Sequence, residues 1–158
     1  MRVFKPSYYD DFKCIAGRCK HNCCIGWEID IDEDTMDLYM SEHGAFGERL
    51  KENISLEGDC PHFVLGKGDR CPFLNDKNLC DVIINMGEES LCQICSDHPR
   101  FINCIEDREE MGIGMCCEEA ARIIVTYKDK VEILGEKSDD EEMVFRLRVV
   151  PLPDKISI

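Results

Sequence analysis

The sequence has little histidine, no excess of positive charge and no long apolar run. Its four histidines show none of the spacing of a zinc finger. No stretch reaches the length of a membrane span, and the first residues, MRVFKPSYYDDFK, contain no apolar run typical of a signal peptide. We therefore expect a cytoplasmic chain with no membrane partner, in a compartment where thiols stay reduced.

Basic residues are fewer than acidic residues in this chain. Lysine and arginine number 19 against 33 aspartates and glutamates, which gives a net charge of −14. Such a chain repels phosphate backbones, and no basic stripe interrupts the acidity, so we expect no nucleic-acid partner. An acidic surface suits a lysine-bearing protein substrate, and it equally suits simple solubility.

Cysteine, by contrast, is abundant, with twelve in 158 residues. A chain of this length can bury a core without disulfides, so metal binding or catalysis is the favoured use of reduced thiols. Because histidine is scarce, an all-sulfur site fits best, which means zinc or an iron–sulfur cluster. The spacing of the cysteines does not distinguish these two metals.

The hydrophobic pattern predicts short elements. The alternation in residues 26–32 predicts a half-buried strand, and residues 32–44 predict a helix that Asp32 or Asp34 caps. Further predictions are a short helix over 45–53, strands within 54–57 and 62–65, a hairpin from Cys71 to Cys80 and a short helix over 88–95. The fold class we expect is small α+β, with short helices, β-hairpins and irregular cysteine-rich loops around a metal centre.

The clearest helical pattern covers residues 116–127, with Ala121, Ile124 and Val125 on one side. Cys116 and Cys117 precede its N-terminus, where we expect the helix dipole to lower the thiol pKa.

Domain organisation is predicted from the change in composition near residue 130. Residues 1–130 are expected to form a cysteine-rich metal-binding domain, and residues 131–158 a partly ordered acidic segment that includes the charge run GEKSDDEE. The last residues, FRLRVVPLPDKISI, show no closing element, so we interpret this segment as the start of a second part.

Several blocks, in this order, resemble the flagellin lysine-N-methylase family: CIAGRCKHNCCIGWEIDID, CPFLNDKNLC, LCQICSDHPRF and MCCEEAARII. That family belongs to a wider group of zinc- or iron-chelating proteins with a C-x-x-C-x-x-C-C pattern, and the resemblance spans residues 8–127. It implies S-adenosylmethionine (SAM)-dependent N-methylation of flagellin lysines in the cytoplasm, with a cysteine-ligated iron–sulfur centre of the 4Fe-4S type, or zinc as the alternative. The implied metal ligands are Cys14, Cys19, Cys23, Cys24, Cys71, Cys80, Cys92, Cys95, Cys116 and Cys117.

The sequence departs from the family in length and in its SAM signature. Family members are considerably longer, and the segment Gly112-x-Gly114 lacks the third glycine of a nucleotide-binding fingerprint. Arg100 is the residue that we predict to bind the SAM carboxylate or to neutralise thiolates. The alternative is a surface arginine in a rigid turn with His98. His98 is a candidate hydrogen-bond donor to a cluster sulfur.

No catalytic base is singled out, with Asp30, Asp32 and Glu118 as the possibilities. The alternative function is a structural or redox metal-binding module that performs no methyl transfer. Cys60 and Cys104 have no close partner in the sequence, and we expect them to be buried, inert thiols.

The adjacent pair Cys23 and Cys24 carries a further expectation. Neighbouring side chains diverge in extended backbone, so the two thiols are expected to have different roles. The principal centre is expected to combine Cys14, Cys19, one member of this pair and a cysteine from residues 71–95.

Overall fold

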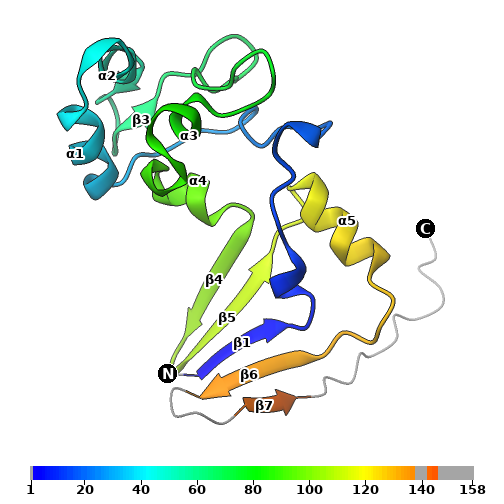
Figure 1. Cartoon of the computed structure of the whole chain (residues 1–158). Helices are drawn as coiled ribbons and strands as arrows, with labels where there is room; N and C mark the ends of the chain where they lie inside the picture. The colour runs from blue at the N-terminus through cyan, green and yellow to red at the C-terminus, as the bar shows by residue number, and fades with distance from the viewer. Residues whose placement is uncertain (1, 138–141, 146–158) are drawn as a thin grey trace, which may run out of the picture.

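The computed structural model describes residues 2–137 and 142–145, which form a helical lobe and a sheet lobe (Figure 1). The helical lobe contains α1 (Glu33–Ser41), α2 (Gly44–Glu52), β2 (Ile54–Ser55), β3 (His62–Phe63), α3 (Asp81–Met86) and α4 (Gln93–Asp97). The sheet lobe contains β1 (Arg2–Pro6), β4 (Arg100–Ile105), β5 (Arg108–Ile113), α5 (Glu118–Thr126), β6 (Ile133–Lys137) and β7 (Glu142–Phe145). Short helices and small sheets confirm the predicted α+β class.

The sheet lobe is built on a five-stranded mixed sheet with the order β4-β5-β1-β6-β7. The parallel pair is β1 with β5, and the other neighbours run antiparallel. Helix α5 packs beside this sheet (Figure 1). Between them lies a small core of Tyr9, Phe12, Ile113, Cys117, Ala120 and Ile123.

The helical lobe has its own core, and cysteines form part of it. Its largest fully buried side chains are Tyr39, Phe73, Ile29, Leu50, Val82 and Cys92. The ring of Phe63 contacts those of Tyr39 and Phe73, with centroid distances of 5.9 and 4.8 Å. Thiols that pack among such apolar side chains are shielded from water.

The helix predicted over residues 32–44 is confirmed as α1. Asp32 caps it, because its side chain accepts a hydrogen bond from the Thr35 backbone N–H at 3.0 Å. Glu33 and Asp34 in the first turn favour the same end through the helix dipole. The predicted helix over 45–53 corresponds to α2.

Other predicted elements differ from the structure. Residues 26–32 form no strand, and an isolated antiparallel bridge joins Asp30 to His62. The Cys71–Cys80 segment has the predicted turn over residues 75–78 and an antiparallel Leu74–Cys80 bridge across it, but no strands, so the hairpin prediction is confirmed only for the turn. Residues 88–95 are broken into a 3₁₀ turn and the start of α4.

The predicted apolar side of α5 is confirmed only in part. Ile124 packs against the core beside Ala120 and Ile123, whereas Val125 is 72% exposed. The buried stripe faces Tyr9 and Phe12, which precede the cysteines in the sequence.

Strands β1, β4 and β5 had no counterpart in the sequence predictions. The predicted boundary at residue 130 stays a prediction, although β6 lies beyond it and pairs with β1. Much of the predicted acidic segment, residues 138–141 and 146–158, lies outside the described residues. No helix in the described part of the chain is long and apolar enough to cross a membrane.

Candidate metal centre

The cysteines gather in two adjoining groups, in which neighbouring thiols influence each other's pKa. The inner thiol group lies in the core of the helical lobe and consists of Cys24, Cys71, Cys80, Cys92 and Cys95. The outer thiol group lies beside the N-terminus of α5 and consists of Cys14, Cys19, Cys23 and Cys117. All twelve cysteines of the chain are free thiols.

Backbone hydrogen bonds bring the inner thiols together from distant segments. The Cys71 N–H donates to the Cys24 carbonyl at 2.9 Å, which joins the first cysteine block to the second. The Cys95 N–H donates to the Cys92 carbonyl at 2.9 Å, so one helical turn presents both thiols. The predicted convergence of the cysteine blocks is therefore confirmed.

Cys23 and Cys24 divide between the two groups. Their thiols hydrogen-bond to each other, which lowers the pKa of Cys23 to about 7 and raises that of Cys24. The further neighbours of Cys24 are inner thiols, whereas Cys23 influences Cys19 and Cys117. Cys14 and Cys19 thus associate with Cys23 and Cys117, rather than with a cysteine from residues 71–95 as expected.

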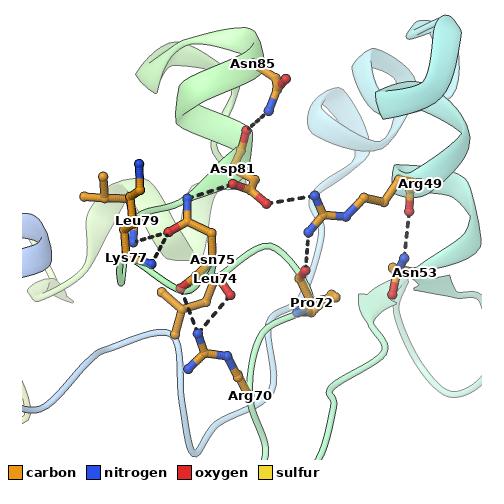
Figure 2. A network of polar contacts seen from close by, with 10 residues as sticks. All are labelled: Arg49, Asn53, Arg70, Pro72, Leu74, Asn75, Lys77, Leu79, Asp81 and Asn85. Carbon is orange, nitrogen blue, oxygen red and sulfur yellow. Dashed lines mark hydrogen bonds and ion pairs between the residues drawn. The ribbon is translucent and has the colours of Figure 1, made fainter.

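A polar network holds the loop that carries Cys71 and Cys80 (Figure 2). The Arg49 guanidinium, on α2, donates to the Asp81 carboxylate at 2.8 Å and to the Pro72 carbonyl at 2.6 Å. Asn75 donates to the other Asp81 oxygen at 2.9 Å, and its own side-chain oxygen accepts from the N–H groups of Lys77 and Leu79. Pro72 and Asp81 directly follow the two cysteines, so this network sets the positions of both thiols.

Arg70 reinforces the same loop from its other side. Its guanidinium donates to the carbonyls of Leu74 and Asn75 at 3.0 and 2.9 Å (Figure 2). Burial alone would raise the pKa of Asp81, but the hydrogen bonds from Asn75 and Arg49 and the Arg49 charge lower it. The Asp81 carboxylate is therefore held in its charged form.

Asp32 and Tyr39 position the segment that carries Cys92. Asp32 accepts from the Gln93 backbone N–H at 2.7 Å, so one carboxylate caps α1 and the start of α4. These hydrogen bonds outweigh burial and lower the pKa of Asp32. The buried Tyr39 hydroxyl donates to the Ser90 carbonyl at 2.8 Å and lies 3.8 Å from the Cys92 sulfur. Asp32 is thus engaged in capping.

Glu118 connects the outer thiol group to α5. Its carboxylate accepts from the backbone N–H groups of Lys20 and His21 at 2.8 and 2.9 Å, and these bonds lower its pKa. Cys117 occupies the N-cap of α5. Burial raises the pKa of the Cys117 thiol in spite of hydrogen bonds from Ala120 and Glu119, so the predicted lowering by the helix dipole is wrong there.

Burial is the largest cause of the raised pKa of four grouped thiols: Cys19, Cys71, Cys80 and Cys117. It raises the pKa of Cys71 and of Cys19 to about 11 and also raises that of Cys80. The Cys92–Cys95 hydrogen bond lowers the pKa of Cys92 and raises that of Cys95. Ligation by a metal requires the deprotonated form, so binding must release protons from this group.

Three cysteines lie outside both groups. Cys116 is exposed in the turn before α5, so the structure does not unite it with the other predicted ligands. Cys60 and Cys104 are exposed as well, and the expectation that they are buried is wrong. Cys60 lies beside Asp30, whose hydrogen bond raises the Cys60 pKa.

The residues around Cys95 contact aromatic rings. The Arg100 guanidinium lies over the rings of Phe12 and Tyr9, 5.1 and 5.8 Å from their centroids. The His98 ring packs 5.3 Å from that of Trp27, and its Nε2 is buried without a hydrogen-bond partner. Burial lowers the His98 pKa. The roles in SAM and cluster binding stay predictions.

The thiols fit a soft metal by their chemistry, since each group supplies sulfur donors from several loops. Within residues 2–137 and 142–145, no three His, Cys, Asp or Glu side chains already stand in the arrangement of a ligated single ion. The ten predicted ligands thus separate into nine grouped thiols and Cys116.

Local sequence pattern contains no signal that Arg49, Asp81 and Glu118 position these thiols. Arg49 is an ordinary helix residue, and Asp81 and Glu118 each follow a cysteine, where an acidic residue also suits the first turn of a helix. Their partners are up to 98 residues away along the chain, beyond the reach of local pattern.

Comparison with known proteins found three related sequences. The chain is 25% identical over 153 residues to the flagellar biosynthetic protein FliU of Salmonella muenchen, covering 91% of this chain and 89% of that protein. It is 24% identical over 163 residues to the lysine-N-methylases of Salmonella choleraesuis and Salmonella typhimurium, covering 98% of this chain.

The chain spans 40% of the length of these two lysine-N-methylases. No family model and no solved structure matches it. Together with the cysteine blocks, the three relatives support the expected resemblance to the lysine-N-methylases. The chain is a distant relative of the lysine-N-methylases and corresponds to the N-terminal part of the longer members of that family.

Proposed function

We propose that this chain is the cysteine-rich part of a SAM-dependent methyltransferase that N-methylates lysine side chains of flagellin. The observation that carries the proposal is the gathering of nine thiols from distant segments into two adjoining groups. The names of the relatives support the methylation and the flagellar link.

The inner thiol group is the proposed seat of an iron–sulfur cluster, with zinc as the alternative. Its donors are all sulfur, and the apolar core around them excludes water. A bound cluster would supply redox or Lewis-acid chemistry at a protected position. Cys24, Cys71, Cys80, Cys92 and Cys95 would hold it, with the Tyr39 hydroxyl 3.8 Å from the Cys92 sulfur as a polar neighbour.

Methyl transfer to lysine needs a neutral amine, so the complete enzyme must remove a proton from its substrate. Asp32 and Glu118 are already engaged by backbone N–H groups, which lowers the pKa of each and makes both weak bases. Neither is therefore our candidate for this step.

A structural or redox metal-binding module is the second candidate function. It is favoured by the position of Arg100, whose guanidinium lies over two aromatic rings of the sheet lobe rather than among the thiols. On this alternative the chain holds metal and performs no methyl transfer.

The test begins with anaerobic purification of the chain and analysis of iron, acid-labile sulfide and zinc. We expect iron and sulfide with broad visible absorption, and we expect a Cys104→Ser control to retain both. Colourless protein with stoichiometric zinc would contradict the cluster. SAM titration of this chain and of a full-length relative, followed by mass spectrometry of flagellin lysines, separates the enzyme from the metal module.

A further inference from the structure

A groove crosses the helical lobe next to β2 and β3, and none of the grouped cysteines lines it. It has a volume of about 840 Å³. One wall is the segment from Gly26 to Glu28, and the other is formed by residues 54–57 and 62–65. Figure 1 shows β3 near α1 and α2 in this lobe.

The floor and rim of the groove combine an aromatic ring with apolar side chains. Trp27, the single tryptophan of the chain, lines it and is half-buried. Its indole N–H donates to the Cys23 carbonyl, and its ring packs against His98. Leu56 and Val64 on the other wall are 70% and 48% exposed. The ring is therefore fixed, and apolar surface is available beside it.

Charge in the groove has one sign. Glu28, Glu57 and Asp69 line it, and the described lining residues include no lysine or arginine. The lining also includes His62, whose Nδ1 lies 3.8 Å from the Glu28 carboxylate. Carboxylates beside an aromatic face attract an ammonium group, and neighbouring apolar side chains cover the aliphatic stem of a lysine.

We propose that this groove binds a lysine-bearing segment of a protein, with the lysine stem along Leu56 and Val64 and the ammonium group near Trp27 and the carboxylates. The proposal rests on the proposed function, because it names where the chain recognises its substrate. Charge complementarity selects this occupant, since an acidic groove on a chain of net charge −14 repels acidic segments.

The same carboxylates affect the protonation state of a lysine bound in the groove. They stabilise the protonated amine, whereas methyl transfer requires the neutral amine. The groove therefore recognises a basic segment and does not host the transfer itself. Because Trp27 hydrogen-bonds to Cys23, the recognised segment lies beside the two thiol groups.

The single tryptophan makes the proposal measurable on the chain as it exists. A short lysine-containing peptide is titrated into the anaerobically purified chain while Trp27 fluorescence is recorded. We expect a saturable change, which is absent when every lysine of the peptide is acetylated. Glu28→Gln combined with Glu57→Gln should raise the dissociation constant at least threefold.

The matched control is Glu48→Gln combined with Glu52→Gln. Both residues are exposed on α2 in the same lobe, and the pair changes the net charge by the same amount. It should leave the dissociation constant within twofold. An unchanged Trp27 signal, or equal weakening by both double variants, overturns the groove as a specific site.

The peptide-binding test of the groove can fail or succeed independently of the methylation test of the proposed function. Saturable binding sensitive to the groove variants, together with a full-length relative that does not methylate flagellin, would retain the groove and refute the methyltransferase. Methylation by a full-length relative together with an unresponsive Trp27 would retain the enzyme and refute the groove.

Discussion

The thiols of Cys23 and Cys24 hydrogen-bond to each other, yet each belongs to a different group of cysteines. Cys24 faces the buried thiols of the helical lobe, and Cys23 faces the thiols beside α5. A single peptide bond therefore joins the inner and outer thiol groups. This relationship leads to the first prediction.

Replacing Cys23 and Cys24 by serine, one at a time, should have unequal effects. Cys24→Ser removes a thiol from the apolar core, so we expect the larger loss of thermal stability and of metal from the inner group. Cys23→Ser should affect the outer group and leave the inner group loaded. Thermal denaturation and metal analysis under anaerobic conditions measure both, and identical losses from the two variants would contradict the division.

Cys71→Ala and Cys92→Ala should each lower metal content and stability together. Both thiols are buried, at 6% and 1% exposure, and ligand binding energy becomes folding energy when the unfolded chain has no formed site. We expect a loss of about 2 kcal/mol or more in the free energy of unfolding. The exposed Cys60 is the control, and Cys60→Ala should change stability by less than about 0.5 kcal/mol. Equal losses in all three variants would refute the grouping.

Asp81→Asn should loosen the loop between Cys71 and Cys80. The substitution weakens the ion pair with Arg49, so we expect a loss of about 1–3 kcal/mol in the free energy of unfolding at neutral pH. Denaturant titration measures it. Asp76→Asn, an exposed change in the same loop, is the control and should cost less than about 0.5 kcal/mol.

The ion pair between Asp81 and Arg49 makes the free energy of unfolding depend on pH. The folded-state pKa of Asp81 is lowered below its ordinary value of 3.8, so its contribution is present above that value and is lost as the pH falls through the folded pKa. The stability difference between wild type and Asp81→Asn should therefore shrink under acid conditions. A difference that stays constant from neutral pH into this acid range would contradict the role of the charge.

Gly47→Ala should destabilise the chain, although an alanine inside a helix normally stabilises it by about 0.5–1 kcal/mol relative to glycine. A Cβ at Gly47, inside α2, would collide with the backbone carbonyl of Glu42. Because backbone cannot move aside cheaply, we expect a net loss of about 1–3 kcal/mol by urea denaturation. Gly66→Ala is the control, since its Cβ would meet only the Arg70 carbonyl at 3.5 Å. A gain in stability from Gly47→Ala would refute the close packing of α1 and α2.

The α+β class and helices α1 and α5 follow from local pattern. Helix α1 is predictable because Asp32 supplies a cap that acts within four residues. The family follows from the order of the cysteine blocks, which is a property of the sequence alone. Strand β1 escaped prediction because its partners β5 and β6 are remote in the sequence, whereas the β4–β5 hairpin escaped because charged residues interrupt the alternation of β5.

The partition of the thiols depends on contacts between remote segments. Cys117 joins Cys14 and Cys19 because Glu118 binds the backbone of Lys20 and His21, and no spacing rule predicts such a contact. The sign of the Cys117 pKa shift likewise depends on burial between the sheet and α5, which outweighs the helix dipole. Local sequence determines which residues are available as ligands, and long-range packing determines which of them meet, because burial and charge act through space rather than along the chain.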